Sequence, residues 1–254
     1  MTALLEVIGL SLGFHGVAVL RDVDLAVERG SITGLIGPNG AGKSSLFNTL
    51  TGLYRANAGQ VRLAGTDITG LSPDRIVARG MVRTFQLARG FPELTVFQHL
   101  MLYGRDQPGE RLAAAIFGSG SARRREADLA ERVFEIARRL RLDHVLDNAV
   151  TALSGGQKKL VEIGRALMAE PQIILFDEPM AGVNPSLTDE IASHLVDLNR
   201  SGITLLLIEH DMALIKRLCD PVIVLAEGTK LTEGSFGDVA ADIRVQEAYL
   251  GKRQ

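Results

Sequence analysis

Gly37-Pro-Asn-Gly-Ala-Gly-Lys-Ser-Ser45 matches the phosphate-loop pattern G-x-x-x-x-G-K-S/T and determines the architecture that we expect for this chain. A short apolar run, Ile32–Ile36, comes directly before the loop and is typical of a strand buried on both faces. A helical stretch, Ser44–Leu53, follows it. A glycine-rich turn without a ligand would also match this sequence pattern, but the order of strand, loop and helix favours a nucleotide-binding loop.

The residue types of this loop suit a nucleoside triphosphate. The glycines let backbone N–H groups turn toward a β-phosphate, and the following helix directs its positive end at the same place. We expect Lys43 to reach the β- and γ-phosphates and the Ser44 hydroxyl to ligate Mg²⁺, so the predicted ligands are ATP and Mg²⁺. The expected nucleotide-binding positions of the loop are Gly37, Pro38, Asn39, Gly40, Ala41, Gly42, Lys43, Ser44 and Ser45.

A second apolar run, Ile173–Phe176, ends in two carboxylates, Asp177 and Glu178. Open α/β sheets bind their ligands at the carboxyl ends of the strands, which is where these side chains would lie. Asp177 is suited to hold Mg²⁺ through its water shell, and Glu178 to polarise the attacking water. An acidic pair after a strand is often only the start of a helix, but behind a phosphate loop it favours a Walker B element.

Hydrophobic periodicity indicates further strands and helices. Val23, Leu25 and Val27 alternate with polar or small residues, as in a half-buried strand, whereas Thr204–Ile208 is again a continuous apolar run. The stretch Ser186–Arg200 is helical in pattern. We therefore expect a parallel sheet with crossover helices.

The middle of the chain, about residues 87–165, has almost no β-branched runs and is rich in Ala, Arg, Leu and Glu. Asp106–Ser121 indicates a loop or an insertion. The cluster Arg123–Arg125 could bind an anion, but the acidic residues after it favour a solvated helix face. An apolar helical stripe is predicted for Leu129, Val133, Ile136 and Leu140.

Composition restricts the class of protein. The 254 residues carry a formal net charge of -2, which gives no electrostatic argument for a nucleic-acid partner, and none is expected. The single cysteine, Cys219, rules out an internal disulfide and is expected to be a buried structural residue. No apolar run approaches the roughly 18 residues of a membrane helix, and Met1–Phe14 lacks the features of a signal peptide. We expect a cytoplasmic chain that reaches a membrane only through another protein.

Leu153-Ser-Gly-Gly-Gln157 resembles the signature motif of ABC ATPases. Ser154 and Gln157 also form a capping-box pattern that would open a helix, and the two interpretations are compatible. The resemblance implies that Ser154, Gly155, Gly156 and Gln157 form a helix N-terminus that binds the γ-phosphate of ATP held by a second ATPase subunit. The resemblance therefore implies a site built between two chains.

The same resemblance implies further site residues. Gln86 corresponds to the glutamine that joins Mg²⁺ and the attacking water, and His210 to the histidine that contacts the γ-phosphate. Phe14 lies where such domains stack an aromatic ring on adenine, with core packing as the alternative. Many relatives carry Asp where this chain has Asn184, so we expect no role there that requires a charge. The implied catalytic residues are Lys43, Gln86, Glu178 and His210, and the implied metal ligands are Ser44, Gln86 and Asp177.

The resemblance covers nearly the whole chain and implies one ABC ATPase domain over residues 1–254. Its fold would be α/β, a P-loop NTPase with a RecA-like core, an N-terminal antiparallel β-subdomain and an inserted α-helical subdomain. The core would comprise 1–86 and 166–254, and the helical signature subdomain 87–165. Apolar residues near Leu87–Phe97 would either receive a helix of a membrane partner or pack in the core; they are Phe91, Leu94, Val96 and Phe97.

Finer motifs resemble the LivG-type ATPases of branched-chain amino-acid importers. They are Arg83-Thr-Phe-Gln86, Val161–Met168, Ala181–Pro185, Glu209–Met212 and Glu247–Gly251. This resemblance implies ATP hydrolysis coupled to import of branched-chain or related amino acids, amides or urea. Its implied partners are transmembrane permease subunits, a second, LivF-like ATPase, and indirectly a periplasmic or extracellular substrate-binding protein, with a homodimer left open. The alternatives are a soluble ABC ATPase outside transport and an ABC system for another cargo.

Overall fold

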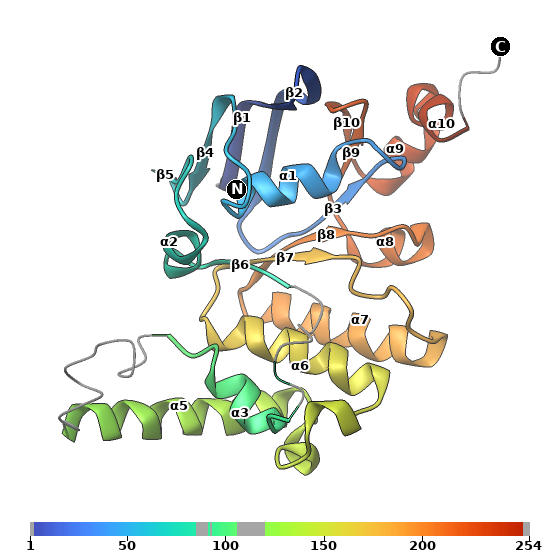
Figure 1. Cartoon of the computed structure of the whole chain (residues 1–254). Coiled ribbons are helices and arrows are strands. Elements are labelled where there is room, and N and C mark those ends of the chain that lie inside the picture. The colour runs from blue at the N-terminus through green and yellow to red at the C-terminus, as the bar shows by residue number, and fades with distance from the viewer. Residues whose placement is uncertain (1–2, 85–90, 92, 106–119, 251–254) are drawn as a thin grey trace. The chain divides into compact units, whose positions relative to one another are not determined.

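The structure is a computed structural model that describes residues 3–84, 91, 93–105 and 120–250. The chain divides into two compact units (Figure 1). Unit 1 comprises Met1–Arg83, Gln172–Gly182 and Thr188–Gln254. Unit 2 comprises Thr84–Pro171 and Val183–Leu187. Each unit is described by itself.

An antiparallel sheet forms the first layer of unit 1. Its four strands lie in the order β2-β1-β4-β5 (Figure 1). They are β1 Ala3–Phe14, β2 Val17–Glu28, β4 Ala58–Leu63 and β5 Thr66–Asp67. The alternation predicted for β2 is confirmed, because Val23, Leu25 and Val27 are buried. This sheet is the antiparallel β-subdomain that the sequence resemblance implied.

A six-stranded sheet forms the second layer of unit 1, in the order β10-β9-β3-β8-β7-β6. All neighbouring strands pair in parallel except β10, which runs antiparallel to β9 at one edge. The strands are β3 Ile32–Ile36, β6 Met81–Arg83, β7 Ile173–Asp177, β8 Thr204–Ile208, β9 Val222–Ala226 and β10 Thr229–Gly234. The continuous apolar runs β3, β8 and β9 are buried along their whole length, as strands covered on both faces must be. The predicted parallel sheet is confirmed.

The helices of unit 1 connect these strands. They are α1 Lys43–Leu50, α2 Pro73–Ala78, α8 Met212–Leu218, α9 Phe236–Ala241 and α10 Ile243–Leu250, and α7 Pro185–Arg200 lies mostly in this unit. Helix α1 ends at Leu50, three residues before the predicted end at Leu53. Gly52 takes a left-handed φ of 75° there, and the N–H groups of Leu53 and Tyr54 both donate to the carbonyl of Asn48. The chain therefore turns away from the helix axis at Gly52.

One hydrophobic core joins the two sheets of unit 1. Leu46 and Phe47 of α1 are fully buried within it, among side chains of both sheets. Because this core holds α1 by its apolar face, the loop that opens α1 is anchored at both ends, by β3 before it and by α1 after it.

Unit 2 is helical in its described part. Its elements are α3 Val96–Met101, α5 Gly120–Arg139, α6 Gly155–Met168 and two 3-10 turns, Asp143–Val145 and Val150–Ala152. The predicted stripe on α5 is confirmed, since its members are buried: Leu129, Val133, Ile136 and Leu140. Most of the expected loop Asp106–Ser121 lies outside the described residues, and its last two residues already belong to α5, whose first residue is Gly120. No helix of the described residues is long and apolar enough to cross a membrane.

Candidate functional site

The carboxyl edge of the parallel sheet in unit 1 gathers the chemically active segments. Strands β6, β7, β8 and β3 pair in parallel, so the residues after each strand emerge at the same edge. The phosphate loop follows β3, and Glu178 and Glu209 directly follow β7 and β8. The register places Asp177 opposite Ile208, and His210 comes two residues later. Residues far apart in the sequence therefore meet here.

The phosphate loop has a backbone that only glycine can follow at two positions. Gly37 has a φ of 152°, and a Cβ there would lie 1.9 Å from the carbonyl oxygen of Leu225 in β9. Gly42 has a φ of 100°, and a Cβ there would lie 2.8 Å from Leu20. Gly40 has a φ of 79°, but a Cβ there would meet nothing within 4 Å. The loop is thus packed tightly at its ends and open at its middle.

The side chain of Lys43 folds back on the phosphate loop and binds its backbone. Its Nζ donates to the carbonyl oxygens of Gly37 at 2.7 Å and Pro38 at 3.1 Å. Burial lowers the pKa of Lys43, while the nearby carboxylates of Glu178 and Asp177 act in the opposite direction. The ammonium is therefore held against the loop on the side that faces the two carboxylates.

The N-terminus of α1 fits a phosphate group. Within α1, which is described throughout, the first turn contains no acidic side chain, and Gly42 at the N-cap supplies no side-chain hydrogen bond. Its first N–H groups therefore keep their capacity to bind an anion. Asn39, Gly40 and Ser44 are exposed, Pro38 and Ser45 are half-buried, and Ala41 is buried. The exposed positions are those that a phosphate could reach.

Asp177 ends β7 in an ion pair with Arg83 at the end of β6. The distance from Arg83 Nη2 to Asp177 Oδ2 is 2.5 Å. The other terminal nitrogen of Arg83 donates to Asn48 Oδ1 of α1, also at 2.5 Å, and the guanidinium lies 5.7 Å from the centre of the Phe47 ring. Asp177 is thus tied to α1 through one arginine.

Glu178 and His210 form a second contact at this edge. His210 Nε2 lies 2.9 Å from Glu178 Oε1, and both side chains are more than two-fifths exposed. Glu178 takes a left-handed φ of 48°, which is strained for a residue with a Cβ. Its N–H donates to the carbonyl of Ile208 at 3.0 Å, so the turn after β7 is bound to the end of β8. The strained turn keeps the carboxylate at the open edge.

Glu209 is a buried carboxylate between these elements. One of its oxygens accepts from the N–H of Met180 at 2.9 Å, and the other from the N–H of His210 at 3.2 Å. Burial raises the pKa of Glu209, although the two N–H donors lower it. Glu209 therefore connects the segment after Glu178 to the backbone of His210.

The oxygen donors at this edge fit Mg²⁺. Ser44 offers an exposed hydroxyl and Asp177 a carboxylate, which are the hard ligands that Mg²⁺ prefers. No group of three or more His, Cys, Asp or Glu residues suited to a metal occurs in the part of the chain that the structure describes. Mg²⁺ commonly uses one or two protein ligands together with phosphate oxygens and water, so this sparse donor set agrees with it.

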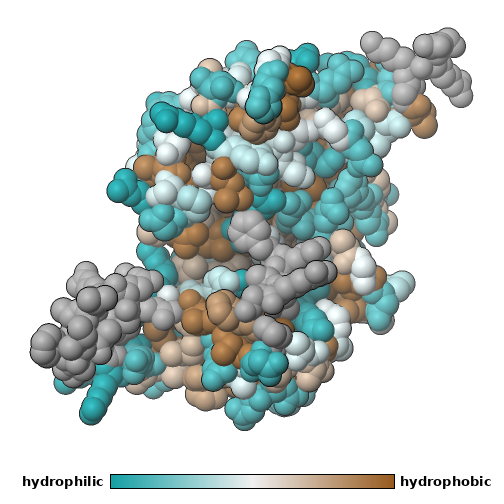
Figure 2. All heavy atoms as spheres, viewed as in Figure 1, coloured by the Kyte–Doolittle hydropathy of each residue, from teal (hydrophilic) through white to brown (hydrophobic). Residues whose placement is uncertain are grey.

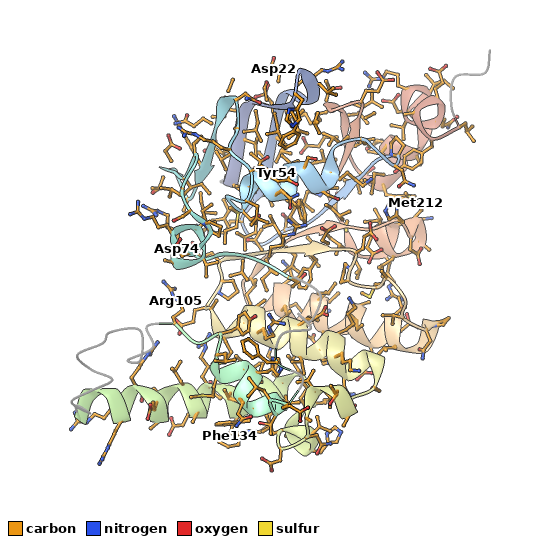
Figure 3. The ribbon with its side chains drawn as sticks, viewed as in Figure 1. Asp22, Tyr54, Asp74, Arg105, Phe134 and Met212 are labelled. Atoms are coloured by element: carbon orange, nitrogen blue, oxygen red, sulfur yellow. The ribbon has the colours of Figure 1, made fainter. Side chains whose placement is uncertain are left out.

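Phe14, the residue expected at the adenine, is 41% exposed at the end of β1 and is not a core residue. Its ring meets Tyr54 edge-on, with ring centres 5.1 Å apart and an interplanar angle of 77°. Tyr54, labelled in Figure 3, lies beside α1. The segment that carries Tyr54 is fixed to β1, because Asn57 Oδ1 accepts from the N–H of Gly13 at 2.6 Å. The two rings therefore form one aromatic surface.

Unit 2 carries the signature residues at the start of α6. The predicted capping box is confirmed: Ser154 Oγ accepts from the N–H of Gln157 at 3.3 Å, and Gln157 Oε1 accepts from the N–H of Ser154 at 3.0 Å. A Cβ on Gly156 would lie 2.4 Å from the end of the Leu187 side chain, so a larger residue at this position would force Leu187 to move. Ser154 and Gly155 are exposed. The helix start thus presents its N–H groups at the surface of unit 2.

Other expected residues have mixed outcomes. Gln86 lies outside the described residues. Of the apolar residues expected either to receive a partner helix or to pack in the core, Phe91 is 59% exposed, whereas Val96 is buried where α3 packs in unit 2, as the core alternative predicts. Leu94 and Phe97 are half-buried. Asn184 Oδ1 accepts from the N–H of Leu187 at 3.0 Å, a role that needs no charge.

Sequence reasoning assigned no role to Arg83, Glu209 or Tyr54. Arg83 and Glu209 stood inside quoted motifs, and the available signal was a charged residue at the end of an apolar strand. Tyr54 gave no comparable signal, since an aromatic residue after a helix is commonly a packing residue. Tyr249 of α10 was quoted only within the C-terminal motif; its hydroxyl interacts with the Gly37 backbone, and burial raises its pKa.

Comparisons with known proteins agree with this arrangement. The family model described as ABC transporter matches residues 20–181. The probable branched-chain amino acid transport ATP-binding protein LivG of Archaeoglobus fulgidus is 38% identical over 248 residues, 98% of this chain and 95% of that protein. The high-affinity branched-chain amino acid transport ATP-binding protein LivG of Escherichia coli K12 is 35% identical over 250 residues, 98% of each chain.

Solved structures lead to the same family. A nucleotide-free ATP-binding cassette from an ABC transporter superposes with a TM-score of 0.87 at 37% identity, covering 99% of this chain and all of the other. The ADP conformation of an ATP-binding cassette of an ABC transporter gives a TM-score of 0.86 at 36% identity, with the same coverage. The phosphate loop, the carboxylate pair and the signature helix are thus parts of a nucleotide-binding protein, and the chain belongs to the ABC transporter family as one of its ATPase subunits.

Proposed function

We propose that this chain powers an ABC importer for branched-chain amino acids or for related amino acids, amides or urea. The observation that carries the proposal is the set of groups at one sheet edge: a glycine-restricted phosphate loop, Lys43, and a Glu178–His210 pair 2.9 Å apart. The cargo follows from the similarity to transport ATP-binding proteins named for branched-chain amino acids.

In the proposed site the loop binds the triphosphate of ATP. Backbone N–H groups of Asn39–Ser45 and the positive end of α1 surround the phosphates, and Lys43 neutralises them. Ser44 and Asp177 would hold Mg²⁺, which would neutralise charge on the phosphates. Phe14 stacks on adenine, with Tyr54 at its edge.

Hydrolysis requires a water directed at the γ-phosphorus and a group that takes its proton. Glu178 is the residue for this task, because its exposed carboxylate lies at the open edge of the sheet beside His210. His210 orients that carboxylate and would contact the γ-phosphate. We assign to Gln86 the role of orienting the water on the family resemblance alone. The bond between the γ-phosphorus and the bridging oxygen breaks, giving ADP and phosphate.

The helix that begins after Ser154 needs a second subunit in this proposal. Its exposed N-terminus, Ser154–Gln157, would bind the γ-phosphate of ATP held by the partner ATPase. A non-identical, LivF-like ATPase is the preferred partner, and a homodimer is the alternative. We assign residues 87–165 to the helical signature subdomain, and 1–86 and 166–254 to the catalytic core. The loss of the γ-phosphate bridge on hydrolysis would let the two subunits separate.

Transmembrane permease subunits are the proposed route to the membrane, with the chain on its cytoplasmic face and a substrate-binding protein acting on the other side. Unit 2 offers an apolar surface for the contact, seen over α3 in Figure 2. Phe134 of α5, labelled in Figure 3, is 46% exposed and packs against Phe97 of α3, with ring centres 5.7 Å apart. Phe91→Ser should lower transport more than basal ATP hydrolysis. Equal losses would contradict the docking surface.

The first experiment measures nucleotide binding and mass by light scattering for purified Glu178→Gln with and without MgATP. We expect ATP to bind and, at high protein concentration, to join two chains. Binding without association would indicate that the non-identical ATPase or the permease is required. A folded protein that binds no ATP would overturn the proposal.

The cargo needs a separate test in cells. Deletion of the gene should abolish high-affinity uptake of labelled leucine, and wild-type protein but not Lys43→Ala should restore it. Lys216→Ala, an exposed lysine on α8, is the matched control and should restore uptake fully. Unchanged leucine uptake together with lost uptake of an amide or urea would reassign the cargo. Unchanged uptake of all of them would favour a role outside this kind of import.

A further inference from the structure

Arg83 connects the two parts of unit 1 that carry the proposed metal ligands. Its two terminal nitrogens reach different elements: Nη2 donates to Asp177 Oδ2 on β7, and Nη1 donates to Asn48 Oδ1 on α1. Both distances are 2.5 Å, and the Arg83 side chain is only 9% exposed. A charged group this well enclosed is held in one geometry, unlike an exposed ion pair.

Asn48, which binds Arg83, lies on the same face of α1 as Ser44. Ser44 and Asn48 are four residues apart in one helix, so they lie on the same face, one turn from each other. The guanidinium therefore spans from the face of α1 that carries Ser44 to the carboxylate of Asp177. Ser44 and Asp177 are the two described residues proposed to hold Mg²⁺.

We infer that Arg83 is a positioning residue that sets the placement of Asp177 relative to Ser44 and thereby tunes metal affinity. The inference rests on the proposed function, since it takes Ser44 and Asp177 as the metal-binding pair. Arg83 occupies one carboxylate oxygen of Asp177 and leaves the other for the metal or its water shell. In this inference the guanidinium acts through its two partners, Asp177 and Asn48, and not on the nucleotide or the metal directly.

The chemistry of the bridge requires arginine. A guanidinium is a planar fork with donors fixed in direction, so it can satisfy an amide oxygen and a carboxylate at once. The guanidinium carbon also lies 5.7 Å from the centre of the Phe47 ring, within the range of a cation–π contact. A lysine at this position would carry the same charge on a single nitrogen and could not hold both partners in these directions.

Two effects of Arg83 on a metal oppose each other. Its positive charge reduces the attraction of Asp177 for a cation, while its hydrogen bond fixes the direction of the carboxylate. Groups that orient metal ligands in this way typically contribute about 10- to 100-fold to metal affinity. We therefore expect the orienting effect to prevail, and removal of Arg83 to weaken metal binding.

The test measures metal binding directly, without turnover. Mn²⁺ is titrated into full-length protein with ADP, and free Mn²⁺ is followed by electron paramagnetic resonance; ADP affinity is measured separately in EDTA. Arg83→Met should raise the half-saturating Mn²⁺ concentration by about tenfold, while ADP affinity in EDTA stays near the wild-type value. Arg79→Met is the matched control, because Arg79 is exposed on the short segment before β6, and it should change neither quantity.

Two further variants separate the bridge from the charge. Arg83→Lys keeps the charge and should still weaken Mn²⁺ binding; Asn48→Leu removes only the anchor on α1 and should shift Mn²⁺ binding in the same direction by less. Unchanged or tighter Mn²⁺ binding in folded Arg83→Met or Arg83→Lys protein overturns the inference. A loss of ADP affinity in EDTA that matches the loss for Mn²⁺ also overturns it, because the effect would then be on the whole site. Failure of the wild-type protein to bind ADP would instead refute the proposed function.

Discussion

Replacing Gly37 by alanine tests whether the packing of the phosphate loop is as tight as the structure has it. The Cβ of Gly37→Ala would lie 1.9 Å from the carbonyl oxygen of Leu225, far inside the contact distance of any carbon and oxygen. Leu225 cannot move away freely, because β9 is paired with β3 on one side and β10 on the other. The loop must therefore shift, and α1 with it.

The expected cost has two parts. A φ of 152° is strained for a residue with a side chain, at about 1–3 kcal/mol, and overpacking in a tight site costs about 1–3 kcal/mol more. Gly37→Ala should thus lose about 4 kcal/mol of stability in total. Gly40→Ala provides the comparison: its φ of 79° is also left-handed, but its Cβ meets nothing within 4 Å, so only the conformational cost of about 1 kcal/mol remains.

Thermal unfolding followed by circular dichroism separates the two variants. For a chain of this size about 3 °C of Tm is lost per kcal/mol, so Gly40→Ala should fall by about 3 °C and Gly37→Ala by about 12 °C. Addition of MgADP should raise the Tm of wild type but not of Gly37→Ala, whose loop is displaced. Equal Tm values for the two variants, or an intact MgADP effect in Gly37→Ala, would show that β9 yields and that the argument from packing is wrong.

Three further outcomes are expected. Burial raises the pKa of the Cys219 thiol to about 12, so Ellman's reagent should react with it slowly in the native protein and at an ordinary thiol rate in urea; fast native labelling would contradict the buried placement. Burial raises the pKa of Glu209 above its ordinary value of 4.5. Glu209 therefore binds a proton more readily in the native protein than in the unfolded protein. The free energy of unfolding of wild type, relative to that of Glu209→Gln, should increase as pH falls from the native pKa toward 4.5. Urea unfolding of both proteins at several pH values measures this, and a difference that is constant with pH, or of opposite sign, would refute it. Tyr54→Ala should weaken ATP binding about fivefold, the equivalent of about 1 kcal/mol of edge-to-face ring contact with Phe14, but leave tripolyphosphate binding unchanged. Tyr54→Phe should bind both ligands as wild type does. Equal losses of affinity for both ligands would place Tyr54 outside the site that binds the base.

The strands and helices were predictable because they depend on local patterns. The continuous run Ile32–Ile36 has no polar face to offer water, so it had to lie between two covering layers. The alternation through Val23 and Val27 likewise indicated one buried face. The predicted end of α1 was wrong by three residues. Leu53 fits the apolar pattern of the helix, but the left-handed backbone at Gly52 ends the helix before that residue.

Three motifs could also be recognised in the sequence: the phosphate loop, the carboxylate pair and the capping box at Ser154. Each consists of residues that are close together in the sequence, so local pattern is enough to find it. The contacts of Arg83, Glu209 and Tyr54 could not be recognised in this way. Arg83 and Asp177 are 94 residues apart, Glu209 and Met180 are 29 apart, and nothing local to any of them specifies the partner.

The sequence by itself thus determined the strands and helices that it marked with a clear hydrophobic pattern, and it indicated the residues to which we assign the phosphate chemistry. The tertiary structure decided which side chains meet. The physical reason is the order of strands in the sheet. β6 pairs with β7, and β7 with β8, although these strands are separated in the sequence. Because the three strands are parallel, their carboxyl ends lie at one edge of the sheet. Only that adjacency brings Arg83 to Asp177 and Glu209 to Met180, and it is set by the burial of whole strands rather than by any short motif.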